Sequence, residues 1–186
     1  MSLKKISLVL VGIGGYGNQY VEALLDDEEH NFEIVGVVDP YPEGCRRLDE
    51  IKARKIPLFS SINEFYKENE ADLAVISSPI HYHEPQTTLA LEKGSSVLCE
   101  KPLAMNSEEA DQMVKVARET DNLLMVGFVR RFEKKVQLLK ESCDKGELGD
   151  IYYTKTGYIR KWGNPGGWFS DKKRSGGGPV IDLGVH

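Results

Sequence analysis

An apolar run near the start of the chain stops abruptly at a cluster of glycines. Residues 6–11 read Ile-Ser-Leu-Val-Leu-Val, and Gly12, Gly14 and Gly17 follow in the spacing G-x-G-x-x-G. The run predicts a buried strand that ends in a tight turn into a helix. In such a turn the first glycine permits the bend, the second lets the backbone approach a pyrophosphate, and the third lets the helix pack against the strand. The residues predicted to contact a dinucleotide here are Gly12, Ile13, Gly14, Gly15, Tyr16 and Gly17.

A second branched strand strengthens this interpretation, because glycine-rich turns are also common where no ligand binds. Residues 33–38 end at Asp39, where this kind of fold needs a carboxylate to accept the adenine ribose hydroxyls. The same carboxylate would repel a 2′-phosphate, and Pro40 leaves no adjacent basic residue to receive one. We therefore expect NAD, with NADP less favoured; Arg46 and Arg47 are the nearby cations that would oppose this preference.

Further apolar segments extend the pattern of alternating strands and helices. Strands are expected at 56–59, 73–78, 96–99 and 123–129. Helix starts are indicated where Ser61 precedes Glu64 and where Asn106 precedes Glu109, and a helix is expected from Pro42 through Arg54. The predicted fold class is α/β, a doubly wound parallel (Rossmann) sheet over residues 1–129. Right-handed crossovers would then bring all the strand ends to one side.

Residues at or just after two of these strand ends are the other candidate cofactor contacts: Ser78, Pro79, His83, Glu100 and Lys101. A lysine at a strand end is usually exposed and structural, but in this topology that edge is where ligands bind. His81 and His83 are more often surface or cap residues than ligands, and no third metal ligand is near them in sequence. We therefore expect no metal site.

Composition excludes several classes of protein. The 186 residues carry a net charge of -5, which disfavours nucleic-acid binding because phosphate neutralisation needs clustered Lys and Arg. No apolar run approaches the roughly 18 residues of a membrane span. Cys45, Cys99 and Cys143 are odd in number and widely spaced, so neither a disulfide framework nor a zinc site is indicated. A cytoplasmic location is the expectation.

The character of the chain changes in residues 130–186, which are expected to begin a second domain of α+β type. Residues 151–160 alternate as a strand with one polar face, and residues 162–178 read as a glycine-rich loop. Pro179 favours the first position of a helix that places Asp182 and His186 on one face. From spacing alone, an accidental helical pair is the favoured interpretation of these two residues.

Taken in order, the motifs G-I-G-G-Y-G, S-S-P-I-H-Y-H-E-P, C-E-K-P-L-A, G-F-V-R-R-F, G-E-L-G-D-I and G-G-G-P-V-I-D-L-G-V-H resemble those of the glucose-fructose oxidoreductase and inositol dehydrogenase (Gfo/Idh/MocA) family. The resemblance implies NAD(P)-dependent oxidation of a sugar, cyclitol or related alcohol. It implies that Lys101, Asp182 and His186 are catalytic and that the Lys101–Pro102 peptide is cis. Two departures are Ile80 and Val129, which stand where the family often has Asn. Members continue with a large open sheet, so the second domain is expected to be incomplete in this chain.

The expected mechanism moves a hydride from a substrate carbon to the nicotinamide while a base takes the hydroxyl proton. His186 is the favoured base, and Asp182 either orients it or holds a neighbouring hydroxyl, while Lys101 donates a hydrogen bond to the substrate oxygen. Lys101 could instead be the base, and sequence does not separate the two roles. The expected substrate is a small sugar or polyol. Copies of the chain are expected to form a homo-oligomer through the second domain. The alternatives are a non-catalytic nucleotide or sugar sensor and an NAD-using glycoside-cleaving enzyme.

Overall fold

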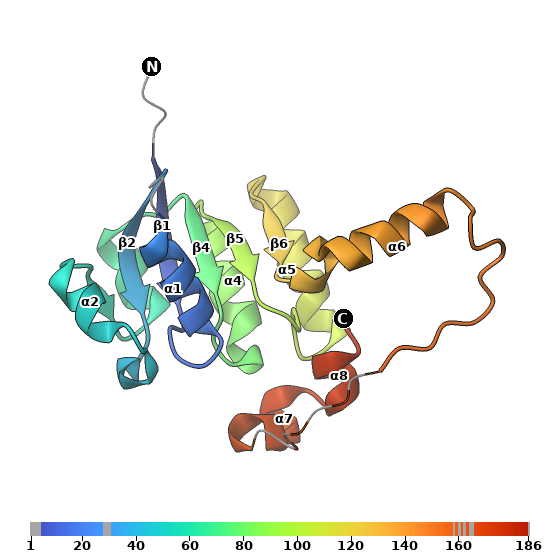
Figure 1. The fold of residues 1–186 in the computed structure, drawn as a ribbon. Coiled ribbons are helices and arrows are strands. Elements are labelled where there is room, and N and C mark those ends of the chain that lie inside the picture. Colours follow the sequence, from blue (N-terminus) through green and yellow to red (C-terminus); the bar gives the residue numbers. More distant parts are fainter. Residues whose placement is uncertain are drawn as a thin grey trace.

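The computed structural model describes residues 5–27, 31–157, 159, 161, 163 and 166–185 and contains a six-stranded parallel sheet (Figure 1). The strands are β1 (Ile6–Val11), β2 (Phe32–Val38), β3 (Leu58–Phe59), β4 (Leu73–Ile76), β5 (Ser96–Cys99) and β6 (Leu124–Val126). Their order is β3-β2-β1-β4-β5-β6, which confirms the doubly wound α/β prediction. The order reverses between β1 and β4, and ligands of such sheets bind beyond the carboxyl ends at this point.

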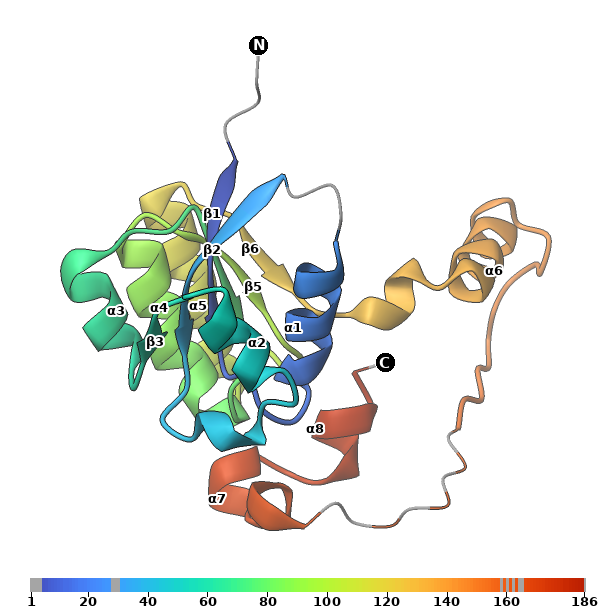
Figure 2. The ribbon, with the colours of Figure 1, turned by 60° about the vertical axis from the view of Figure 1, so that its left-hand side comes forward.

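Helices cover both faces of the sheet (Figure 2). One face carries α1 (Gly17–Asp26) and α2 (Leu48–Ala53), and the other carries α3 (Ile62–Glu68), α4 (His83–Glu92) and α5 (Ser107–Thr120). Successive side chains of a strand point to opposite faces, and β1 shows this directly. Val9 and Val11 join the core under α3, α4 and α5, whereas Leu8 and Leu10 join the core under α1 and α2. This double burial explains why the strands read as continuous apolar runs.

Both predicted helix starts are confirmed. The side chain of Ser61 accepts a hydrogen bond from the main-chain N–H of Glu64, and Asn106 does the same for Glu109. The Glu64 carboxylate reaches back to the main-chain N–H of Ser60 instead of Ser61, so the reciprocal bond lies one residue earlier than in a standard capping box.

One helix prediction and one loop prediction were wrong in detail. The segment from Pro42 through Arg54 is not one helix, because the 3-10 turn η1 (Pro42–Gly44) and the shorter α2 are separated at Cys45, whose side chain packs into the core. The expected loop at 162–178 contains the 3-10 turn η4 (Gly167–Ser170) and α7 (Lys172–Ser175). The Asp171 side chain caps α7, a local interaction that carries no periodic signal.

The expected strand at 151–160 was also wrong over its described part, because residues 151–157 and 159 form no strand. A strand needs a hydrogen-bonded neighbour, and this segment pairs with none of the described strands. Tyr152 and Tyr153 are consequently exposed. This segment joins α6 (Lys134–Asp144), which follows the 3-10 turn η3 (Val129–Phe132), to the last helices of the chain.

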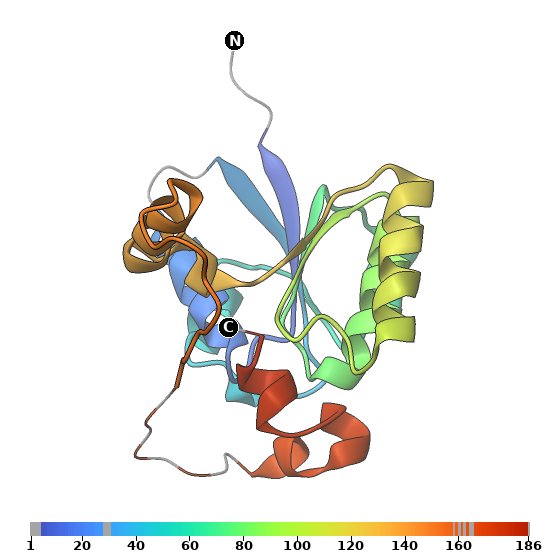
Figure 3. The same ribbon diagram turned by 90° about the vertical axis from the view of Figure 1, so that its right-hand side faces the viewer.

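The last helices return to the carboxyl end of the sheet. Figure 3 shows α7 and α8 (Pro179–Leu183) across the end of the sheet that lies opposite the N-terminus. The return is tightly packed, because a Cβ on Gly176 would lie 2.8 Å from the main-chain oxygen of Met105. Pro179 is the first residue of α8, as predicted. This return brings residues about 80 positions apart together at one edge, as the Lys101 and Asp182 pair shows.

Candidate functional site

Two glycines of the first turn are required by close packing. Gly12 has a φ of +81°, and a Cβ there would lie 2.7 Å from the main-chain nitrogen of Ser78. A Cβ on Gly17 would lie 2.0 Å from the main-chain oxygen of Gly12. The turn therefore fits between β4 and the start of α1 only because both side chains are hydrogen, which matches the first and third roles predicted for the motif.

The middle of the same turn is open. A Cβ on Gly14 would meet no protein atom closer than 3.8 Å, and one on Gly15 would meet none within 4 Å. The protein itself therefore does not explain the glycine at position 14. A pyrophosphate lying against the backbone here, at the N-terminus of α1, accounts for it, so the residues present fit a bound dinucleotide.

The Asp39 carboxylate is held next to this turn by two main-chain donors. The N–H of Ile13 donates to one oxygen at 2.9 Å, and the N–H of Tyr41 donates to the other at 2.8 Å. Each carboxylate oxygen keeps a further lone pair for a ligand hydroxyl. Asp39 is thus oriented at the end of β2, where a ribose is expected.

The two nearby arginines are paired with carboxylates of the protein. Arg46 lies 3.1 Å from Glu22, and Arg47 bonds both Asp26 and Glu50. Their positive charge is therefore already compensated by α1 and α2. Both arginines are thus engaged by carboxylates of the protein, which disfavours their use as partners of a 2′-phosphate next to Asp39.

Asn18 is a site residue that sequence reasoning missed. Its amide nitrogen donates to the main-chain oxygens of Gly15 and Gly44, and its amide oxygen accepts from the N–H of Arg46. It therefore ties the glycine turn to the segment after β2. An asparagine within the expected helix was the available sequence signal, because asparagine is unfavourable there unless its side chain bonds the backbone.

The end of β4 is tied to the same turn. The Ser77 hydroxyl donates to the main-chain oxygen of Gly12 at 2.6 Å, and the Ser78 hydroxyl donates to Gln86 at 2.6 Å. Pro79 precedes the 3-10 turn η2 (Ile80–Tyr82), and His83 then begins α4. His83 is buried with both ring nitrogens against main-chain oxygens, so it lies beneath this turn instead of facing the open edge.

Glu100, at the end of β5, is buried and well bonded. It is 5% exposed, accepts a 2.5 Å hydrogen bond from the Tyr20 hydroxyl and a 3.0 Å bond from the N–H of Lys101. A Cβ on Gly127 would lie 2.6 Å from its carboxylate, so the main chain just after β6 packs closely on it. Burial, and then this carboxylate, raise the pKa of Tyr20 well above its ordinary value, so the phenol stays a donor. The sequence pattern indicated only that Tyr20 is an apolar position of the first helix, and gave no sign of its hydrogen bond to Glu100.

Changing Tyr20 to Phe is expected to lower the free energy of unfolding by about 1–3 kcal/mol, because a buried charged acceptor loses its donor. Urea denaturation measures this. Tyr41→Phe is the matched control, since the Tyr41 ring is exposed, and its effect should stay within about 0.5 kcal/mol. Equal effects of the two substitutions would show that the bond to Glu100 contributes nothing to stability.

Lys101 meets Asp182 at this edge. The Lys101 amine donates to the Asp182 carboxylate at 2.7 Å and to its main-chain oxygen at 3.1 Å. The two side chains are 18% and 30% exposed, so both remain accessible to a small molecule. The Lys101–Pro102 peptide is cis, as the resemblance implies. His186, the third expected catalytic residue, lies outside the described residues.

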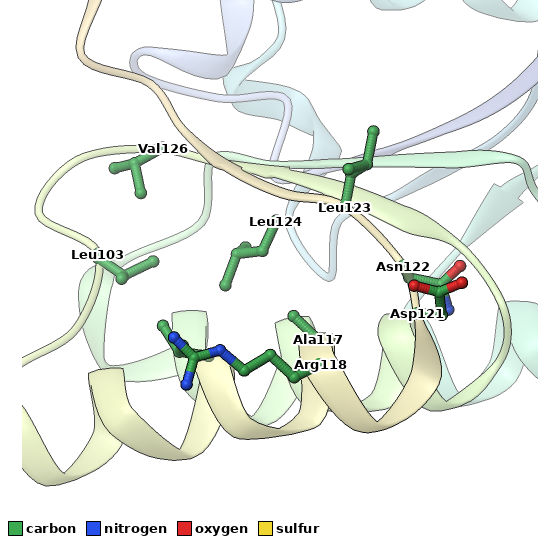
Figure 4. A pocket seen from close by; sticks show the side chains of 9 residues that line it. Leu103, Ala117, Arg118, Asp121, Asn122, Leu123, Leu124 and Val126 are labelled. Carbon is green, nitrogen blue, oxygen red and sulfur yellow. The ribbon is translucent and has the colours of Figure 1, made fainter.

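A separate hollow lies between α5 and β6 and is shown in Figure 4. It is lined by Leu103, Val114, Ala117, Arg118, Asp121, Asn122, Leu123, Leu124 and Val126. None of the candidate site residues lines it.

Within the described part of the chain, no group of three or more His, Cys, Asp or Glu side chains is arranged to hold a metal ion. No described helix is long and apolar enough to cross a membrane.

Two family models match the chain. The model described as "Oxidoreductase family, NAD-binding Rossmann fold" (GFO_IDH_MocA) matches residues 6–128, and the "GFO/IDH/MocA C-terminal domain" model matches residues 136–186. Among curated proteins, D-glucoside 3-dehydrogenase of Escherichia coli is 33% identical over 187 aligned residues, covering 100% of this chain and 53% of the relative. The chain spans about half the length of the curated relatives it matches.

Solved structures agree with this similarity. The WlbA dehydrogenase from Bordetella pertussis, in complex with NADH and UDP-GlcNAcA, has a TM-score of 0.72 at 29% identity, covering 80% of this chain and 42% of that one. The scyllo-inositol dehydrogenase from Lactobacillus casei, with bound NAD(H) and scyllo-inositol, has a TM-score of 0.70 at 26% identity, covering 80% and 43%.

Proposed function

Since this chain belongs to the Gfo/Idh/MocA oxidoreductase family and carries its NAD-binding Rossmann domain, we propose that the protein oxidises an alcohol carbon of a sugar or cyclitol. The observation that carries this proposal is the Lys101 and Asp182 pair, placed beyond the strand ends on the same edge as the open glycine turn. A lysine and a carboxylate beside a dinucleotide site can bind and polarise a hydroxyl group.

Each residue has a distinct proposed role. The turn at Gly14 and the N-terminus of α1 hold the pyrophosphate, and Asp39 holds the adenine ribose. When bound, NAD supplies the hydride acceptor. Lys101 donates a hydrogen bond to the substrate oxygen and stabilises negative charge that develops there. Asp182 orients the Lys101 amine, and His186 is proposed as the base that takes the hydroxyl proton.

A preference for NADH over NADPH is expected, with a dissociation constant for NADPH at least about 10-fold higher, because the Asp39 carboxylate repels a 2′-phosphate. Fluorescence titration of the two reduced cofactors measures it. Asp39→Ser should bring the dissociation constants of NADH and NADPH closer together, because it removes the carboxylate that repels the 2′-phosphate. Similar constants for the unaltered protein would contradict the role proposed for Asp39.

The proposed reaction is tested by incubating the protein with NAD and a panel of alcohols and following the absorbance of NADH. The panel contains compounds of the classes named for the similar proteins: D-glucosides, scyllo-inositol and a UDP-linked amino sugar acid. Net NADH formation with one class supports the proposal. Net NADH formation also separates it from a sensor and from glycoside cleavage through transient oxidation, since neither of these accumulates NADH.

We also propose that the second domain begins near residue 130 and contributes a contact between copies of the protein. Exposed apolar side chains at Phe132, Leu138, Leu139 and Tyr152 support this proposal, because such side chains seek further protein surface. Light scattering during size-exclusion chromatography tests it, and a monomer at all concentrations would contradict it.

A further inference from the structure

His83 contacts the main chain of both loops that form the candidate site. Its Nε2 lies 2.8 Å from the main-chain oxygen of Ser78, and its Nδ1 lies 2.9 Å from that of Pro102. Ser78 follows β4, next to the glycine turn, and Pro102 follows Lys101. The side chain is 2% exposed, so no water competes freely for these contacts. One imidazole therefore spans the distance between the cofactor side and the lysine side of the edge.

Both partners of this ring are acceptors, so each contact needs an N–H from His83. A neutral imidazole has only one N–H, and both contacts are hydrogen bonds only when the ring carries two. Burial lowers the pKa of His83 below its ordinary value, and the contacts with the main chain of Ser78, Pro102 and Leu103 offset this only in part, so the ring donates to one of the two loops at a time. The two loops therefore share one buried donor group.

The neighbouring histidine does not share this arrangement. The Nδ1 of His81 lies 3.2 Å from the main-chain oxygen of Arg174, and its ring packs on Tyr82. The two rings thus have separate partners, and both nitrogens of His83 are already occupied. His81 and His83 therefore do not converge on a shared ligand. Of the two, His83 is the one that contacts both loops of the candidate site.

We propose that His83 is a positioning residue that fixes the Ser78–Pro79 turn and the Lys101–Pro102 segment relative to each other. This proposal rests on the proposed function, because it concerns how the cofactor turn and the catalytic lysine are aligned. The two contacts come from different ring nitrogens, so they can be separated by substitution. The asparagine amide reaches the place of Nδ1, and the glutamine amide reaches the place of Nε2.

The test compares His83→Asn, His83→Gln and His83→Leu in the full chain. The first readout is the NADH dissociation constant from fluorescence titration. The second is the rate at which the Lys101 amine reacts with an acylating reagent, followed by peptide mass spectrometry. His83→Gln keeps the Ser78 contact, so NADH affinity should stay within about threefold while Lys101 labelling rises at least about fivefold. His83→Asn should weaken NADH binding about tenfold and leave labelling within about twofold.

His83→Leu loses both contacts and should change both readouts. His81→Leu is the matched control and should change neither. Opposite patterns for the asparagine and glutamine variants support the proposal. Parallel changes that follow the loss of thermal stability in every variant would overturn it, because a merely structural residue affects both readouts together. If the unaltered protein bound no NADH, the proposed function would fail, whereas Lys101 labelling would still decide the role of His83.

Discussion

Replacing Lys101 by methionine is expected to lower turnover at least about 100-fold while the NADH dissociation constant stays within about threefold. Methionine fills a similar volume but cannot donate a hydrogen bond to the substrate oxygen. Lys101 bonds Asp182 and lies beyond β5, whereas the pyrophosphate is proposed to lie over the turn after β1. The loss should therefore appear in kcat and kcat/KM, not in cofactor binding.

Steady-state kinetics with the best alcohol of the panel, together with NADH titration, measures this separation. Lys115→Met is the matched control, because Lys115 is exposed on the outer face of α5 and should be neutral in both assays. A fall in NADH affinity as large as the fall in activity would show instead that Lys101 binds the cofactor or supports the fold.

Gly14→Ala and Gly17→Ala are expected to impair different properties: the first NADH binding, the second the stability of the fold. A Cβ at position 14 has room within the protein, so stability should remain within about 0.5 kcal/mol, but the Cβ enters the space proposed for the pyrophosphate. We expect NADH affinity to fall at least about 30-fold, since the backbone can no longer approach the phosphates.

A Cβ at position 17 lies 2.0 Å from the main-chain oxygen of Gly12, so α1 must move away from β1. Gly17→Ala should therefore lower the free energy of unfolding by at least about 2 kcal/mol, or prevent folding. Thermal denaturation and NADH titration of both variants provide the comparison. A stable Gly14→Ala protein that binds NADH normally would show that the pyrophosphate does not lie against this turn.

Local patterns made the dinucleotide-binding half of the fold predictable. The continuous apolar strands, the spacing of Gly12, Gly14 and Gly17, and the placement of Asp39 are all set by a few neighbouring residues. These patterns reflect strands buried on both faces and a turn that packs too closely for side chains. The confirmed helix starts at Ser61 and Asn106 are equally local.

The parts that sequence reasoning missed depend on contacts between distant residues. Tyr20 and Glu100 lie 80 positions apart, and nothing near Tyr20 indicates that its hydroxyl meets a buried carboxylate. The pairing of Lys101 with Asp182 has no local signal either, and only the family resemblance suggested a shared role. The segment 151–157 was wrongly predicted because alternation signals a strand only when a neighbour is available.

A crystal structure of the protein with NADH shows whether one edge of the sheet brings the dinucleotide and Lys101 together. We expect the pyrophosphate over Gly14, the adenine ribose on Asp39, and the nicotinamide ring next to the Lys101 amine. A nicotinamide directed away from Lys101, or a pyrophosphate bound elsewhere than at the N-terminus of α1, would contradict this placement.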